Sequence, residues 1–218
     1  MDISTIGNLL LFILLIILTM LFVGSEFAFV KARMSKIHAL VEMGDKRAVR
    51  VEKMINNLDY YLSACQLGIT VTALGLGWIG ESTFEVILHP LFNFIGIPDS
   101  VSTVATVAAA FVIVTFIHVV VGELAPKTVA IQYAEKMALT LSGPLYFFGV
   151  VLKPFIWTMN GAARGLVRLA GIKEMPTEQA HSEEELKVIM TESYQSGEIN
   201  QTELAYMQNI FSFDERTA

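Results

Sequence analysis

Apolar residues lie in long continuous runs along the chain rather than at alternating positions. Three of these runs, residues 3–30, 60–80 and 100–121, hold almost no charged side chain. A helix needs about 20 predominantly apolar residues to cross the hydrocarbon core of a bilayer. No Lys or Arg interrupts the 73 residues between Lys53 and Lys127. The pattern therefore predicts an all-α membrane protein with three transmembrane helices.

Residues 137–160 form a fourth apolar run, which hydropathy alone would make a fourth span. A fourth crossing would carry Arg164, Arg168 and the acidic C-terminal residues outside, against the positive-inside rule. Pro144 and Pro154 also interrupt the run, and proline costs a helix interior about 3 kcal/mol unless its neighbours satisfy the backbone. We expect a kinked pair of helices on the cytoplasmic side instead.

A dense basic cluster follows the first run. By the positive-inside rule it lies in the cytoplasm, so we expect the amino terminus outside the cell membrane and the C-terminal region inside. Apolar positions in residues 34–58 recur at helical spacing, which predicts one basic amphipathic helix along the inner membrane surface. The cluster consists of Lys31, Arg33, Lys36, Lys46, Arg47, Arg50 and Lys53.

Charge divides the chain into two parts. Residues 1–173 hold 13 basic and 11 acidic side chains, whereas residues 174–218 hold 2 basic and 10 acidic ones. We therefore expect a transmembrane domain with juxtamembrane belt helices over 1–173. A small cytoplasmic bundle of acidic helices is expected over 174–218.

Two capping patterns predict that the acidic part is a helical hairpin. Ser182 with Glu185 forms one capping box, and Asn200 with Glu203 forms another. Gly197 stands between them, and glycine is typical of a helix end. Ten acidic residues cannot all face the contact between two short helices, so one surface of the hairpin is expected to be strongly negative.

Composition supports a membrane protein and excludes two other classes. Of the 218 residues, 54% are apolar and 17% are charged, and the mean hydropathy is +0.56. Cys65 is the only cysteine, which excludes a disulfide-stabilised secreted scaffold. The net charge of −6 and the lack of a basic stripe exclude a nucleic-acid-binding protein. The four histidines are scattered, so a zinc or copper site is disfavoured.

Two carboxylates lie within or beside the predicted spans, Glu26 and Glu123. Ionisable groups at such depth are costly and are usually functional. Pro126 stands four residues after Gly122 and has no N–H, so the Gly122 carbonyl cannot accept its usual helical hydrogen bond. A free carbonyl beside a carboxylate, near the negative end of a helix, outlines a hard-oxygen site for Mg²⁺, Ca²⁺ or Na⁺.

Three polar side chains of the second run are candidates to complete the ligand shell. Ser63, Gln66 and Thr70 are spaced i, i+3 and i+7, so they share one helix face. Simpler roles stay open at this point. Each hydroxyl could bond the carbonyl four residues earlier, and each intramembrane carboxylate could pair with the lysine that follows it.

Short motifs in all three spans resemble those of the CorC/cyclin M (CNNM) family of magnesium transporters. They are Gly-Ser-Glu at 24–26, LSACQLGIT at 62–70 and GELAPK at 122–127, the last being the most specific. Residues 182–218 resemble the acidic bundle that links the family's membrane domain to paired CBS domains. The resemblance therefore implies that CBS domains would follow this chain.

The resemblance also implies a homodimer of three-span subunits that holds a largely dehydrated Mg²⁺. Many relatives have Ser at the position of Val23 and Asn at the position of Ile69, so here Gln66 or Thr70 would complete the shell. The ligands carried over position by position are Ser25, Ser63, Gly122 through its carbonyl, and Glu123.

The expected function is Mg²⁺ transport, in the form of Na⁺-coupled export by alternating access. Mg²⁺ is the transported ion and Na⁺ the candidate coupling ion, while ATP would bind only to the CBS domains. The alternative is a membrane-anchored module that senses cations and regulates another transporter. No enzyme activity is expected, and the expected partners are Mg²⁺, the lipid bilayer and a second copy of the chain.

Overall fold

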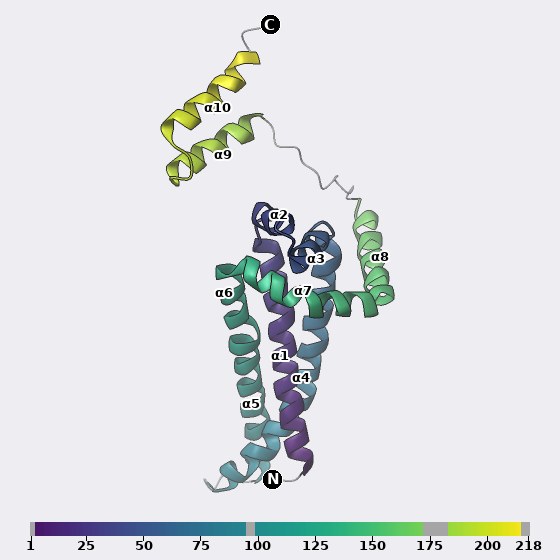
Figure 1. Cartoon of the computed structure of the whole chain (residues 1–218). Coiled ribbons are helices and arrows are strands. Elements are labelled where there is room, and N and C mark those ends of the chain that lie inside the picture. The colour runs from purple at the N-terminus through teal and green to yellow at the C-terminus, as the bar shows by residue number, and fades with distance from the viewer. Residues whose placement is uncertain (1–2, 95–98, 172–182, 215–218) are drawn as a thin grey trace. The chain divides into compact units, whose positions relative to one another are not determined.

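The computed structural model describes residues 3–94, 99–171 and 183–214, and the secondary structure within these ranges is entirely helical (Figure 1). The chain forms two compact units, Met1–Leu166 and Val167–Ala218. The helices are α1 (Ile3–Lys31), α2 (Met34–Glu42), α3 (Lys46–Ile55), α4 (Leu58–Phe94), α5 (Asp99–Ile117), the π-helix η1 (His118–Leu124), α6 (Ala125–Gln132), α7 (Ala134–Val151), α8 (Lys153–Leu169), α9 (Glu183–Gln195) and α10 (Gln201–Asp214).

Three stretches of the described helix are each long and apolar enough to cross a membrane, as predicted. They are Ser4–Lys31, Leu58–Leu88 and Thr103–Gln132. Figure 1 shows α1, α4 and α5 running side by side along the long axis of the first unit. The third stretch passes from α5 through η1 into α6, so it extends beyond the predicted 100–121.

Glycines of α4 allow the three long helices to pack closely. A Cβ atom at Gly68 would lie 2.5 Å from the Phe22 ring of α1, and one at Gly80 would lie 2.8 Å from Val114 of α5. Gly75 lies similarly close to α1. Small residues let helices approach in lipid, where burial of apolar surface does not favour association. Gly68, Gly75 and Gly80 therefore lie at helix contacts, whereas Gly77 has open space beside it.

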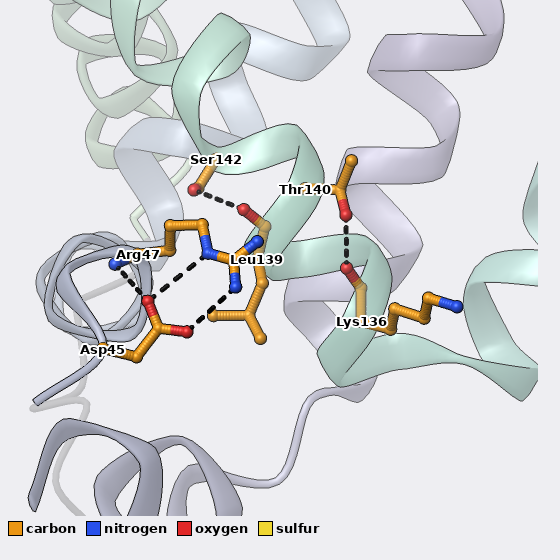
Figure 2. Close-up of polar contacts among 6 residues, drawn as sticks. All are labelled: Asp45, Arg47, Lys136, Leu139, Thr140 and Ser142. Carbon is orange, nitrogen blue, oxygen red and sulfur yellow. Dashed lines mark hydrogen bonds and ion pairs between the residues drawn. The ribbon is translucent and has the colours of Figure 1, made fainter. Parts of the chain in front are cut away.

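The prediction of one helix over residues 34–58 was wrong, because a turn separates α2 from α3. Gly44 has φ +85°, a left-handed conformation that glycine adopts at low cost. Asp45 then caps α3 by accepting a hydrogen bond of 2.8 Å from the Arg47 backbone N–H (Figure 2). The two local signals, a glycine and an N-cap aspartate, end one helix and start the next.

One face of α3 is buried against α7. Ala48, Val51 and Met54 are fully buried, while the Arg50 guanidinium lies close to Gly143 of α7. A second link joins α2 to α7, where Lys36 Nζ lies 3.4 Å from a Glu135 carboxylate oxygen. The helices α2 and α3 therefore fix α7 against the end of the bundle at which α1 ends.

The kink expected in the fourth apolar run is present. α7 and α8 meet at an angle of 78° at Leu152, two residues before Pro154. The predicted interruption at Pro144 is wrong, because α7 continues through this residue. Figure 1 shows α7 lying across the three long helices rather than along them. The side of the membrane on which this pair lies stays a prediction.

The second unit contains the predicted acidic hairpin of α9 and α10. The Asn200 N–H donates to Glu203 over 2.8 Å, and the Glu203 N–H donates back to Asn200 over 2.9 Å, which confirms this capping box. Gly197 has φ +79° in the turn. The other predicted box includes Ser182, which lies outside the described residues.

Candidate cation site at the π-helix

The third long helix changes its winding where the sequence predicts a free carbonyl. Over His118–Leu124 the backbone is a π-helix, and the Ala125 N–H donates to the Val120 carbonyl five residues earlier. Pro126 in the first turn of α6 has no N–H to offer to Gly122. π-Helical turns are rare and are frequent at functional sites. The wider winding keeps this segment helical even though one regular hydrogen bond is missing.

α1 packs directly on this π-helix. A Cβ atom at Gly122 would lie 3.4 Å from the Thr19 methyl group. Further along α1, Gly24 faces Pro126 of α6 and Met137 of α7. Thr19 and Gly24 of α1 therefore lie close to the segment that carries the GELAPK motif.

Ser25, which directly follows Gly24 in α1, is a buried polar group. It is fully buried, and its hydroxyl has no hydrogen-bond partner among the described residues. A buried polar group without a partner costs about 1–3 kcal/mol, so such a group is unusual and needs an explanation. A hydroxyl oxygen in this position is available as a ligand for a cation.

Glu123 lies beside a histidine rather than a lysine. Its Oε1 is 3.5 Å from His118 Nε2, a buried atom that makes no hydrogen bond among the described residues. Lys127 instead places its Nζ 4.6 Å from the centre of the Phe27 ring. The simpler role in which Glu123 pairs with Lys127 is therefore absent from the structure. Glu26 likewise forms no ion pair with Lys31 in the described part of the chain.

The three candidates from α4 have ordinary local roles. Ser63 is half-buried and donates to the Asp59 carbonyl over 2.8 Å, and Thr70 donates to the Gln66 carbonyl over the same distance. The structure thus places Gly122 at the contact of α1 with η1 and Glu123 next to it, while Ser25 is buried beside Gly24 of α1. Gln66 and Thr70 are exposed on α4. The shared role of all these candidates as Mg²⁺ ligands stays a prediction.

Sequence reasoning missed a buried threonine bridge beside the π-helix. Thr19 Oγ1 of α1 lies 2.9 Å from Thr72 Oγ1 of α4, and both residues are buried. Thr72 Oγ1 accepts this bond and donates its own proton to the Gly68 carbonyl of α4, while the Leu15 carbonyl of α1 is a second acceptor within reach of the Thr19 hydroxyl. Thr19 is the only polar residue between positions 8 and 25, and this isolation was the available signal. The bridge joins two spans at the level of Gly122.

The available ligand atoms suit a hard cation. Nowhere in the described ranges do three His, Cys, Asp or Glu side chains gather. A cation at this contact would therefore be held by one carboxylate together with hydroxyl and carbonyl oxygens. That ligand set matches the preference of Mg²⁺, Ca²⁺ and Na⁺ for oxygen.

These helices define an integral membrane protein in which a π-wound span carries polar groups into an apolar bundle. The sequence pattern of the cyclin M transmembrane N-terminal domain (CNNM) matches residues 10–203. The chain belongs to this family, which confirms the resemblance drawn from its motifs. The family consists of membrane transporters rather than enzymes. It is linked to the transport of Mg²⁺ and other divalent cations or to the regulation of that transport.

Curated relatives extend well beyond the length of this chain. The UPF0053 protein YrkA of Bacillus subtilis is 59% identical over 212 residues, which cover 97% of this chain and 49% of the relative. YugS of the same organism is 54% identical with the same coverage. The uncharacterized protein Rv1841c of Mycobacterium tuberculosis is 33% identical over 203 residues, which cover 92% of this chain and 57% of the relative. The chain thus spans about half the length of the relatives it matches.

Proposed function

We propose that this chain binds Mg²⁺ at the contact of α1 with η1 and α6 and moves it across the membrane. The observation that carries the proposal is the fully buried Ser25 hydroxyl, which has no partner in the described structure and directly follows Gly24, the α1 residue that lies close to Pro126 of the GELAPK motif. The proposed ligands are Ser25, Glu123 and the Gly122 carbonyl, completed by Ser63 and by Gln66 or Thr70.

The proposed mechanism is Na⁺-coupled export by alternating access. Mg²⁺ releases its water reluctantly, so a site that strips it needs fixed oxygens and at least one carboxylate. Glu123 supplies that charge, and its side chain is 41% exposed. Exposure of the site to the other side would require α1 to move relative to η1. The Thr19–Thr72 bridge would couple this movement to α4, because it ties α1 to α4.

A flux assay tests the proposal directly. Purified protein is placed in liposomes that contain a Mg²⁺-sensitive dye, with and without an opposing Na⁺ gradient. We expect Mg²⁺ flux that follows Na⁺ and is lost in Glu123→Gln and Ser25→Ala. Ser35→Ala, which changes an exposed serine of α2, is the matched control and should retain full flux.

The alternative function, a cation-sensing regulatory module, makes the opposite prediction. The separate acidic hairpin of α9 and α10 favours this alternative, because a cation would neutralise its surface charge. A regulator would show no flux by itself, although Mg²⁺ would still bind. Equilibrium binding of Mg²⁺ together with absence of flux would therefore replace the transport proposal with the regulatory one.

The proposed topology places the amino terminus outside and the basic belt of α2 and α3 in the cytoplasm, with a homodimer as the active form. A protein that lacks Cys65 and carries Gly171→Cys reports the side of the α8 end. We expect no reaction of this cysteine with an impermeant reagent in intact cells. Labelling from outside would show that α7 and α8 cross the membrane.

A further inference from the structure

A cavity of about 190 Å³ lies between α4 and α5. Gly77 and Glu81 line it from α4, one helical turn apart, and Phe111, Thr115 and His118 line it from α5 and η1. A Cβ atom added at Gly77 would meet no other atom within 4 Å, which leaves room at this point of the interface. The cavity is therefore built from two helix faces, each of which contributes polar groups within an apolar span.

Glu81 is an unusual residue for the wall of such a cavity. It lies within the apolar stretch Leu58–Leu88, it is exposed, and it forms no ion pair with any described residue. A carboxylate at this depth is costly unless it meets water or a cation. Glu85 lies one turn further along the same helix but lines neither this cavity nor its neighbour.

His118 connects the cavity with the candidate cation site. It lines the cavity, while its buried Nε2 lies 3.5 Å from Glu123 Oε1. Its Cδ2 would also lie 3.3 Å from a Cβ atom at Gly122. One side chain therefore separates the cavity from two of the proposed ligands.

A second cavity of about 540 Å³ continues the first. The two share Glu81 and Phe111, and the second extends along α5 as far as Thr103. Residues 103 and 118 are separated by about 22 Å along a helix that rises 1.5 Å per residue, which is most of the roughly 30 Å of hydrocarbon in a bilayer. The cavities together, here named the α4–α5 groove, run from η1 towards the membrane face at which α5 begins.

We propose that the α4–α5 groove is the vestibule through which a divalent cation passes between the site at η1 and that membrane face. Glu81 draws the cation into the groove, and His118 is the positioning residue between the groove and Glu123. This inference rests on the proposed transport function. The other occupants of an exposed groove, a lipid chain or a second copy of the chain, would exclude water from it.

Cysteine labelling tests whether the groove holds water. Cys65 is the only cysteine, so Cys65→Ala gives a protein without thiols. Thr115→Cys in this protein should react with a charged, impermeant thiosulfonate, and Mg²⁺ should slow the reaction. Phe116→Cys is the matched control, because Phe116 is 66% exposed on α5 and does not line the groove. Absence of reaction at both Thr115→Cys and Gly77→Cys would overturn the vestibule.

Flux measurements test the role of Glu81. Loss of its charge should raise the Mg²⁺ concentration at half-maximal flux about tenfold, the lower range of electrostatic focusing in a charged cleft. The maximal flux of Glu81→Gln should change little, and Glu85→Gln should behave as the unmodified protein. Equal effects of the two substitutions would overturn the role of Glu81. Unmodified protein without flux overturns the proposed function, whereas unreactive groove cysteines with intact flux overturn the vestibule alone.

Discussion

The second and third long helices both pack against α1, yet they respond differently to residues that weaken a helix. α4 contains four glycines between residues 68 and 80 and remains one continuous α-helix. The third span contains Gly122 followed by Pro126 and changes to π-winding over His118–Leu124. In lipid, glycine costs little because the backbone has no water to bond with, so helical hydrogen bonds persist. Proline removes a donor, so the Gly122 carbonyl loses its regular helical hydrogen bond.

Glycine has different roles in α4 and in η1. Glycines of α4 create room for neighbouring side chains, as Gly68 does for the Phe22 ring. Gly122 also permits close approach, to Thr19, but its carbonyl is deprived of its regular donor by Pro126. Close packing therefore occurs at glycines with and without a following proline, whereas the candidate cation site coincides with a glycine and a proline four residues apart.

The largest effect is expected from Gly68→Ala, which tests the packing half of the comparison. The added Cβ would lie 2.5 Å from the Phe22 ring, which is itself held against Phe148. Overpacking of this kind destabilises by about 1–3 kcal/mol. Gly77→Ala is the control, since open space surrounds that position. Unfolding in detergent by a denaturant series measures both, and equal stabilities would contradict the packing role.

Pro126→Ala tests the other half of the comparison, the effect of a proline four residues after a glycine. The new N–H can bond the Gly122 carbonyl, so we expect the π-helix to shorten and the protein to gain about 1 kcal/mol of stability from one hydrogen bond. Mg²⁺ flux should fall at the same time because a ligand is withdrawn. Pro144→Ala, in α7, provides a proline control without the flux loss. A variant that is unchanged in both stability and flux would show that the Gly122 carbonyl has no special role.

Thr19→Val removes the bridge between the first two spans. Hydrogen bonds between membrane helices contribute about 0.6 kcal/mol on average, and Thr72 keeps its bonds to carbonyls of α4. We expect a loss of this size in denaturant unfolding. Thr140→Val, which removes only a bond to the Lys136 carbonyl in the same helix (Figure 2), should have a smaller effect. Similar losses in the two variants would argue against the interhelical bond.

The smallest effect concerns pH and the belt. The hydrogen bond from His38 to Glu52, 2.9 Å long, and the charge of Glu42 raise the pKa of His38 above its ordinary value of 6.5. Protonated His38 therefore stabilises the contact of α2 with α3 below pH 6.5, and this contribution is lost as the pH rises through the raised pKa. The midpoint of denaturant unfolding should fall slightly as the pH rises from 6.5 through the raised pKa of His38. The substitution His38→Gln should remove this pH dependence. A midpoint that responds to pH equally in both proteins would contradict the link.

Part of the candidate site was visible in the sequence. Gly122, Glu123 and Pro126 define it by spacing alone, because the loss of a proline N–H is a local fact of covalent structure. Ser63, Gln66 and Thr70 do share a helix face, as their spacing requires. That face is not the one directed at α1, because Gly68 and Thr72 occupy the buried side of α4. Periodicity shows which residues lie together on a helix but leaves its rotation undetermined.

The sequence by itself determined the three spans, the kinked fourth run and the acidic hairpin, since hydrophobic length and capping are properties of neighbouring residues. The turn at Gly44 also followed local rules, although helical spacing concealed it. Only the tertiary structure decided that Ser25 is buried without a partner among the described residues, that Thr19 meets Thr72 and that His118 lies beside Glu123. These contacts join residues of different helices or depend on π-winding, so they arise only when packing sets the rotation and depth of each helix in the bundle.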